Sequence, residues 1–170
     1  MAKRIGVLSD THGFLEPRIF HHFEHVDEIW HAGDIGDLKV LDDLQAFKPT
    51  RAVFGNIDNA IIRRETSEFL RFKVDEVEVL ITHIAGKPGS YSVPLNKELQ
   101  KNGVPKILVC GHSHITLVKN DPFKNMLWMN PGACGNKGFH TVKTILRFTI
   151  DGTNIKDLEC IELGKRAAGL

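Results

Sequence analysis

The feature that most limits the fold of this chain is a local pattern that occurs five times: a short apolar run that ends in polar residues, in most cases beside a glycine. Runs of about four to six apolar or β-branched residues closed in this way are typical of buried β-strands. The polar segments that follow the runs are residues 9–13, 33–34, 55–58, 82–83 and 111–114. The chain is therefore expected to carry polar groups at the ends of several buried strands.

Helical patterns lie between the first of these runs. Residues 17–23 begin with a proline, which is favourable in the first turn of a helix. Residues 38–47 have the spacing of an amphipathic helix and end before Pro49. Strands that alternate with helices indicate right-handed crossovers and a largely parallel sheet, which binds ligands at the carboxyl ends of its strands. The polar segments lie at those ends.

The later part of the chain has hairpin patterns instead. Segments 69–74 and 77–81 flank Asp75 and Glu76, and segments 141–150 and 155–163 flank the turn signal Asp151-Gly152. A further helix is expected at about residues 93–102. A parallel first half and a meandering second half predict an α/β fold with two sheets packed face to face and helices outside. No linker or repeat divides the sequence, so residues 1–170 are expected to form one domain.

Charge and cysteine content exclude several classes of partner. The 22 basic and 21 acidic residues leave no bulk charge that would attract long nucleic acids or an anionic membrane. The apolar runs are far shorter than the roughly 20 residues that span a bilayer, and the N-terminus lacks the pattern of a signal peptide. Three cysteines without a C-x-x-C pair are typical of reduced thiols. We therefore expect a cytoplasmic protein with no membrane partner and no long nucleic-acid substrate.

The polar residues at the predicted strand ends are of the types that bind metal ions. Asp10 and His12 stand two apart, as do His112 and His114, so the members of each pair can point to one side of an extended segment. Buried carboxylates and imidazoles are costly unless they are paired or bind a metal. Mixed nitrogen and oxygen ligands suit Mn²⁺, Fe, Zn²⁺ or Ni²⁺. The candidate ligands are Asp10, His12, Asp34, Asn56, His83, His112 and His114.

The other histidines have less informative surroundings. His21, His22 and His25 cluster in or beside a predicted helix, where a solvated face explains them. His31 lies inside an apolar run, which favours a structural or supporting role, with a catalytic role as the alternative. The position of His140 predicts neither a ligand nor a structural role.

In their order along the chain, these motifs resemble those of the calcineurin-like metallophosphoesterases, most of all their small YfcE-type phosphodiesterase branch. The resemblance extends from Lys3 to about Ile150 and rests on an ordered set. The set is Asp10-x-His12, Gly33-Asp34, Gly55-Asn56-x-Asp58, Thr82-His83, Gly111-His112-Ser113-His114 and Asn130-Pro131-Gly132. The resemblance implies a four-layer αββα sandwich, in which two mixed sheets lie between helical layers.

The resemblance also implies a dinuclear metal site, with Mn²⁺ as the expected ion. One ion would be held by Asp10, His12, Asp34 and His114. The other would be held by Asp34, Asn56, His83 and His112, with Asp34 as the bridge. A metal-bound hydroxide would attack a phosphate that spans the two ions, and Asn56 would take part in catalysis by orienting that phosphate. The implied protein is a phosphodiesterase acting on small phosphate esters, and analogy with small relatives suggests a homo-oligomer.

Two departures from the family pattern affect the chemistry. Ile57 stands where many relatives have a histidine that protonates the leaving group, so the general acid is unassigned, with Asp58, His31 or a metal-bound water as alternatives. The segment 84–91 lacks a histidine-glycine-histidine run. We expect a mobile loop there, with Lys87 or Tyr91 as substrate contacts, and a plain surface loop as the alternative.

The competing function is a non-catalytic, metal-binding interaction module. A retromer subunit shares the implied fold and uses it mainly to bind protein partners, having lost ligand residues. In the present sequence every expected ligand position is filled, which favours the enzyme.

Overall fold

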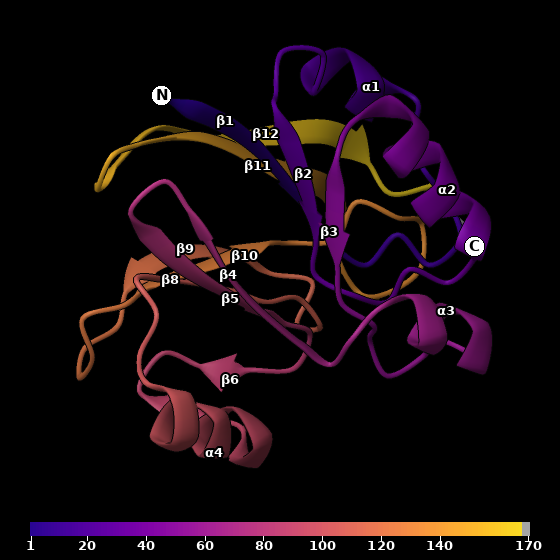
Figure 1. Ribbon diagram of the computed structural model, residues 1–170. Coiled ribbons are helices and arrows are strands. Elements are labelled where there is room, and N and C mark those ends of the chain that lie inside the picture. The colour runs from indigo at the N-terminus through magenta and orange to yellow at the C-terminus, as the bar shows by residue number, and fades with distance from the viewer. Residues whose placement is uncertain (168–170) are drawn as a thin grey trace.

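The computed structural model describes residues 1–167 of the chain and contains two five-stranded sheets with helices on their outer sides (Figure 1). In the first sheet the strand order is β12-β11-β1-β2-β3, and β1, β2 and β3 are parallel, as predicted. These strands are β1 (Lys3–Leu8), β2 (Glu28–His31), β3 (Thr50–Ala52), β11 (Val142–Asp151) and β12 (Asn154–Lys165). The last three residues of the predicted 1–170 domain lie outside the described residues.

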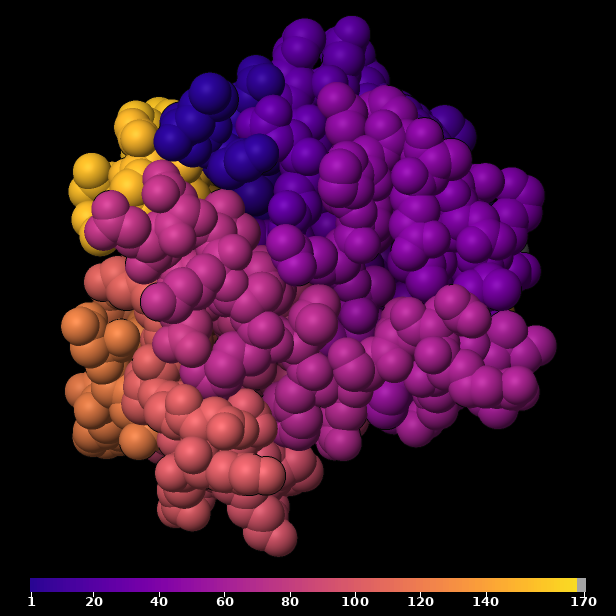
Figure 2. All heavy atoms as spheres, viewed as in Figure 1, coloured from indigo at the N-terminus to yellow at the C-terminus, as the bar shows by residue number. Residues whose placement is uncertain are grey.

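The second sheet corrects the prediction of a meandering second half. Its order is β4-β5-β8-β10-β9, and its central strands β5, β8 and β10 are parallel. The strands are β4 (Phe69–Val74), β5 (Val77–Thr82), β8 (Ile107–Val109), β9 (Thr116–Asn120) and β10 (Leu127–Pro131). The predicted C-terminal hairpin exists, but it joins the first sheet, where β11 pairs antiparallel with β1. Figure 2 shows the yellow C-terminal segment beside the indigo N-terminal residues.

The helices cover the outer faces of the two sheets. They are α1 (Arg18–His22), α2 (Leu38–Phe47), α3 (Ala60–Glu65) and α4 (Val93–Asn102). The predicted bounds of α2 and α4 are confirmed, and α1 is shorter than the predicted 17–23. Helix α3 was not predicted. It is short, and its N-cap is Asn59, whose side chain accepts hydrogen bonds from the backbone amides of Ile61 and Ile62. A small hairpin joins β6 (Gly86–Lys87) to β7 (Ser90–Tyr91).

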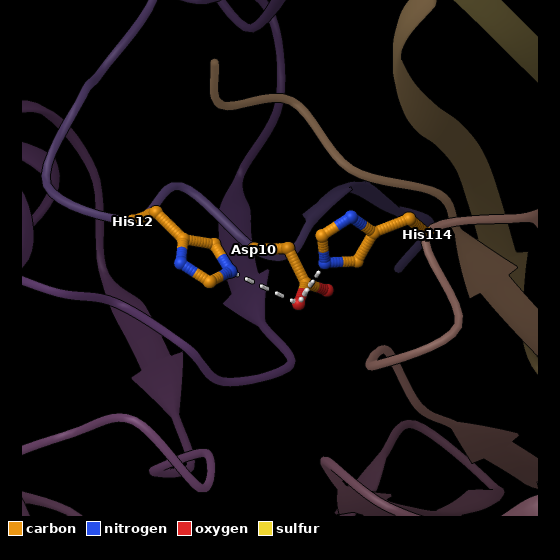
Figure 3. Close-up of side chains that lie close together, drawn as sticks. All are labelled: Asp10, His12 and His114. Atoms are coloured by element: carbon orange, nitrogen blue, oxygen red, sulfur yellow. Dashed lines mark ion pairs between the residues drawn. The ribbon is translucent and has the colours of Figure 1, made fainter. Parts of the chain in front are cut away.

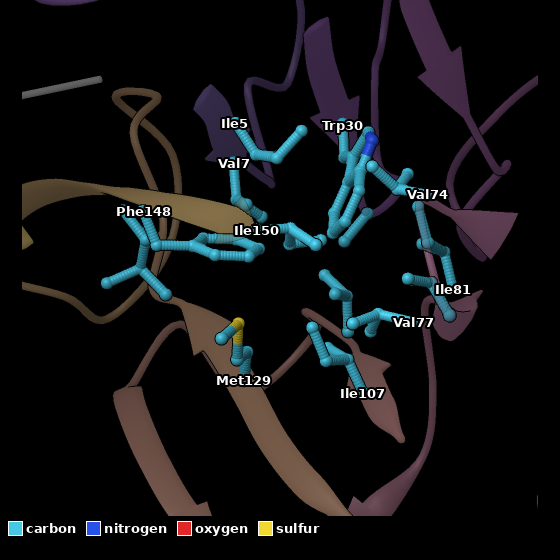
Figure 4. Packing of buried hydrophobic residues seen from close by; sticks show 14 of the residues in the cluster. Ile5, Val7, Trp30, Val74, Val77, Ile81, Ile107, Met129, Phe148 and Ile150 are labelled. Atoms are coloured by element: carbon cyan, nitrogen blue, oxygen red, sulfur yellow. The ribbon is translucent and has the colours of Figure 1, made fainter. Parts of the chain in front are cut away.

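Three buried apolar clusters fill the three spaces between the four layers. Between the two sheets lie alternate strand residues such as Val7, Trp30 and Ile107 (Figure 4). Their neighbours in sequence point to the opposite faces, so Leu8 packs with residues of α1 and α2, and Leu108 packs with residues of α4. This alternation fixes which face of each strand is buried, and it leaves the strand ends free to carry polar groups.

A buried ion pair holds the loop after β1 against β11. Lys143 Nζ lies 2.6 Å from Glu16 Oε2, and Arg18 Nε donates to Glu16 Oε1 at 2.8 Å. Glu16 is 7% exposed and Lys143 5%. The Arg18 guanidinium and, after it, the Lys143 ammonium lower the pKa of Glu16 from 4.5 to about 2. Because this loop carries Asp10 and His12, the pair also anchors part of the polar cluster.

We expect Glu16 to make the stability of the protein depend on acid pH. Its folded-state pKa is below the unfolded value, so its contribution is fully present above about pH 4.5 and is lost as the pH falls through about 2. The urea midpoints of the wild-type protein and of Glu16→Gln, compared across this range, should differ most at neutral pH and converge in acid. A difference that stays constant as the pH falls would contradict this assignment.

Candidate metal centre

The seven predicted ligands meet where the carboxyl ends of parallel strands of both sheets come together. Each lies in the loop that follows a strand, as the sequence pattern predicts for a parallel arrangement. Backbone hydrogen bonds join these loops: the amide of Asp10 donates to the carbonyl of Gly33, and the amide of Gly111 donates to the carbonyl of His83. The loops after β1 and β2 are therefore joined to each other, as are the loops after β5 and β8.

The first group of side chains consists of Asp10, His12 and His114 (Figure 3). Each offers one ligand atom, and these atoms all lie within 4.8 Å of one another. His114 Nε2 is 3.1 Å from Asp10 Oδ1, and His12 Nε2 is 3.7 Å from the same oxygen. The Oδ1 atom of Asp10 is thus the point on which both imidazoles converge.

The second group consists of Asp34, His83 and His112, whose ligand atoms also lie within 4.8 Å of one another. His83 Nε2 is 3.3 Å from Asp34 Oδ2, and that oxygen is 3.4 Å from His12 Nε2 in the first group. Asn56 borders the second group, with its Oδ1 3.1 Å from His112 Nδ1. Asp34 therefore lies between the two groups.

The two groups fit divalent metal ions because their facing atoms lack other partners. Among the described residues, the buried side-chain atoms without a hydrogen-bond partner are Asp10 Oδ1, His12 Nε2 and His83 Nε2. The opposite atoms are satisfied: Ser9 Oγ donates to Asp10 Oδ2 at 2.6 Å, and His83 Nδ1 lies 2.7 Å from the carbonyl of Ala32. Native proteins rarely leave buried polar atoms without partners, so this arrangement fits a cation bound between these atoms.

The backbone at these positions is unusual as well. In the described part of the chain seven non-glycine residues have a positive φ, and five of them are predicted ligands. They are Asp10 (56°), His12 (47°), Asp34 (54°), His112 (71°) and His114 (61°). The left-handed conformation is unfavourable for residues with a β-carbon, and such residues concentrate at functional sites.

The carboxylates and imidazoles of the cluster shift one another's pKa values. Burial opposes ionisation of Asp10 and Asp34, but their imidazole neighbours outweigh it and hold both pKa values well below the usual range. The two carboxylates raise the pKa of His12 to about 9. The metal-free cluster is therefore an arrangement of fixed negative charges that binds protons, and a divalent cation would have to displace those protons.

Asp58, an alternative for the general acid, is a structural residue. Its carboxylate accepts hydrogen bonds from the backbone amides of Ile35, Gly36 and Gly55, at 2.8–3.1 Å. It thereby joins the loop after β2 to the loop after β3, which carry Asp34 and Asn56. Three charge-assisted bonds of this kind leave the carboxylate little capacity to deliver a proton.

His31, a second alternative for the general acid, is fully buried. Its Nδ1 accepts from the amide of Gly33 at 3.1 Å, and its Nε2 lies 3.0 Å from Thr11 Oγ1. Burial lowers the pKa of His31 to about 4, so the ring is neutral. These contacts agree with the structural role that the sequence favoured.

The loop after β5 does not present Tyr91 to the cluster, contrary to the suggested substrate contact. The Tyr91 hydroxyl donates to Asp121 Oδ1 at 2.7 Å, and its ring stacks on Trp128 with centroids 6.2 Å apart. The amide of Gly89 donates to the other oxygen of Asp121. Asp121 thus ties this loop to the β9–β10 connection.

One histidine beside the cluster was missed by the sequence reasoning. His140, in the loop between β10 and β11, is 8% exposed, and its Nδ1 lies 3.2 Å from Nδ1 of His114. The two residues are far apart in sequence, and no motif surrounds His140, so no local signal could have joined them.

Comparison with known proteins identifies the family. Residues 4–153 match the calcineurin-like phosphoesterase superfamily domain. The chain belongs to the calcineurin-like phosphoesterases. It is 33% identical over 135 residues to a "probable metallophosphoesterase" of Methanocaldococcus jannaschii, a match that covers 76% of this chain and 67% of that protein. The resemblance inferred from the motifs is thereby confirmed.

Two solved structures have the same architecture. An archaeal phosphodiesterase aligns with a TM-score of 0.69 and 25% identity, over 94% of this chain and 99% of that one. Vps29 of Chaetomium thermophilum aligns with a TM-score of 0.73 and 12% identity, over 97% and 100% of the chains. At that identity the second comparison concerns the fold alone. The comparison with Vps29 confirms the sandwich of two mixed sheets.

The calcineurin-like phosphoesterases are metal-dependent hydrolases of phosphate esters, and two candidate metal-binding groups lie at the strand ends of this member. Small phosphate esters are the substrate class that the family implies. In the part of the chain that the structure describes, no helix has the length and apolar character needed to cross a membrane.

Proposed function

We propose that the protein is a phosphodiesterase that binds two divalent metal ions, with Mn²⁺ as the preferred ion. The observation that carries the proposal is the pair of adjacent ligand groups with Asp34 between them. One ion would be held by Asp10, His12, Asp34 and His114, and the other by Asp34, Asn56, His83 and His112. Two divalent ions held by these residues would supply Lewis acidity toward a phosphate ester and a nucleophile at neutral pH.

The residues of the chain have separate tasks in this proposal. Asp34 holds the two groups in register, because its Oδ1 accepts from the amide of Ile57 at 3.1 Å while its Oδ2 faces both groups. Asn56 lies at the exposed side of the second group with its Oδ1 toward His112. Its amide nitrogen would be free to donate to a phosphate oxygen and so orient the ester for in-line attack.

A cavity beside the second group supports a diester rather than a monoester as the substrate. It has a volume of about 240 Å³ and lies against Asn56 and His83, with Phe54, Ile84 and Pro94 among its lining residues. The cavity has a mixed lining, since Arg63 and Glu68 also border it, and its apolar part can accept one of the two organic groups of a phosphodiester. A monoester could fill this cavity only if its single organic group, which is also its leaving group, pointed into it.

The absence of an assigned general acid favours esters with good leaving groups. Asp58 and His31 are engaged in backbone hydrogen bonds, and Ile57 occupies the position of the histidine found in many relatives. A leaving group that is stable as an anion needs no proton from the protein. Aryl diesters are therefore the best first substrates.

We expect hydrolysis of a bis-aryl phosphodiester to be absent in metal-stripped protein and to appear when Mn²⁺ is added. The specificity constant for the diester should exceed that for the corresponding aryl phosphomonoester by about tenfold or more, because only the diester can fill the cavity while a second group leaves. Steady-state assays with both substrates measure this ratio. A preference for the monoester would contradict the diesterase proposal.

The alternative is an interaction module that binds metal and cleaves nothing, and the similarity of fold to Vps29 is the observation in its favour. Metal binding without hydrolysis of either ester, with any of the divalent ions, would support this alternative. Homo-oligomerisation and a cytoplasmic location stay predictions from the sequence.

A further inference from the structure

The imidazole of His114 has a different outer partner from that of His83. His83 directs its Nδ1 to a backbone carbonyl, that of Ala32, at 2.7 Å. His114 directs its Nδ1 instead to a second imidazole, that of His140, at 3.2 Å. The far nitrogen of His114, Nε2, lies 3.1 Å from Asp10 Oδ1. The ring thus lies between His140 and the first ligand group.

The proton positions in this chain of groups follow from its last member. His140 Nε2 lies 2.8 Å from the carbonyl oxygen of Gly135, which can only accept a hydrogen bond. His140 must therefore carry a proton on Nε2, and the neutral ring has a lone pair on Nδ1. That lone pair accepts the Nδ1 proton of His114. A neutral His114 with its proton on Nδ1 has a free lone pair on Nε2, the atom that faces Asp10.

Packing holds the two rings in this relation. They meet edge to face, with centroids 5.1 Å apart and an interplanar angle of 75°. Gly138 lies against both: a β-carbon there would overlap the ring of His114 and come within 3.2 Å of His140 Nδ1. Arg166 Nε donates to the carbonyl oxygen of His140 at 2.9 Å, which fixes the backbone of the same loop. His140 is therefore confined in both position and orientation.

We propose that His140 is a positioning residue for the first metal ion: it holds His114 in the tautomer that leaves Nε2 free to bind the metal. This inference rests on the proposed function, because it assigns His114 as a ligand. A hydrogen-bond acceptor behind a ligating imidazole fixes the tautomer and the ring orientation, and removal of such a partner typically lowers metal affinity roughly 10- to 100-fold. Only the first group should be affected, since His140 contacts none of Asp34, His83 and His112.

Two substitutions separate the tautomer from the packing. His140→Phe keeps a ring against His114 but removes both nitrogens. His140→Asn places an amide oxygen near the position of Nδ1, so it restores the acceptor. His25→Phe is the matched control, because His25 is an exposed histidine whose Nε2 lies 3.7 Å from Oε2 of its neighbour Glu24. Nitrogen NMR of the metal-free proteins reports the tautomer of His114, and calorimetric titration with Mn²⁺ reports the affinity of each site.

We expect His114 of the metal-free wild-type protein to carry a proton on Nδ1, the nitrogen that faces His140. His140→Phe should show a mixture of tautomers and a weaker first site by roughly 10- to 100-fold, with the second site unchanged. His140→Asn should restore the proton on His114 Nδ1 and bring the affinity of the first site to within about threefold of the wild-type value. His25→Phe should match the wild type in both measurements. These results together support the positioning role.

Several results would overturn it. They are a wild-type His114 that lacks a proton on Nδ1, an unchanged first-site affinity in His140→Phe, and an equal loss at both sites. If His140→Phe does not fold, the positioning role is decided by the tautomer of His114 in the wild type and by the affinity of the first site for Mn²⁺ in His140→Asn. A wild-type protein that binds no Mn²⁺ would instead refute the proposed function, so the two failures are distinguishable.

Discussion

Replacing Asp34 by asparagine is expected to reduce the kcat/KM of the Mn²⁺-loaded protein roughly 10³-fold or more while leaving the fold intact. The Oδ2 atom of Asp34 faces His12 at 3.4 Å and His83 at 3.3 Å, so one charged atom serves both groups. An asparagine has nearly the same shape, and its amide oxygen can still accept from the amide of Ile57. The substitution therefore removes the negative charge but keeps the shape of the side chain and its hydrogen bond.

The test compares kcat/KM, metal stoichiometry and thermal midpoint in the same preparations. Asp43→Asn is the matched control, because Asp43 pairs with Lys39 on the exposed face of α2 and touches no ligand. The control should keep wild-type activity and change stability by no more than about 0.5 kcal/mol. Activity of Asp34→Asn within tenfold of the wild type would refute the bridging role.

Replacing Gly55 by alanine should have the second largest effect. A β-carbon at position 55 would lie 2.8 Å from Asp34 Cγ and closer still to its Oδ1 and backbone nitrogen. Either Asp34 or the loop that carries residue 55 must therefore move. Asp34 is a predicted ligand whose own backbone is in the left-handed conformation. We expect a loss of activity of about 100-fold or more and a loss of stability of about 1–3 kcal/mol.

Gly152→Ala is the control for this substitution. Gly152 lies in the β11–β12 turn, and no atom is within 4 Å of the β-carbon that it would gain. Its φ of 63° is left-handed, so alanine there should cost stability, about 1 kcal/mol, without affecting activity. Denaturant unfolding and metal-saturated assays separate the two effects. Full activity in Gly55→Ala would show that the loop after β3 tolerates displacement of Asp34.

The polar cluster could be predicted because its signal is local. Each ligand follows an apolar run, and the rule that parallel strands share their carboxyl edge brings such residues together without knowledge of the strand order. Helices α2 and α4 could be predicted for the same reason, since amphipathic spacing and a capping Ser92 or Asp37 are properties of short segments.

Features that depend on distant pairing could not be predicted. Strand β10 pairs parallel with β8 and antiparallel with β9, and nothing in residues 116–131 specifies those partners. Asp58 was recognised as part of a motif, but its role depends on the adjacency of β2 and β3. His140 reaches His114 only after β10 and β11 have joined different sheets.

The convergence of loops from both sheets has a consequence for how the protein unfolds. Each ligand group takes members from the two sheets: Asp10 and His12 follow β1, and Asp34 follows β2, whereas His83, His112 and His114 follow β5 and β8. Ions bound in these groups would join the sheets at one edge, in addition to the apolar layer between them. Opening the sandwich would then require release of both ions, so the concentration of free metal would affect the stability of the folded chain as well as its activity.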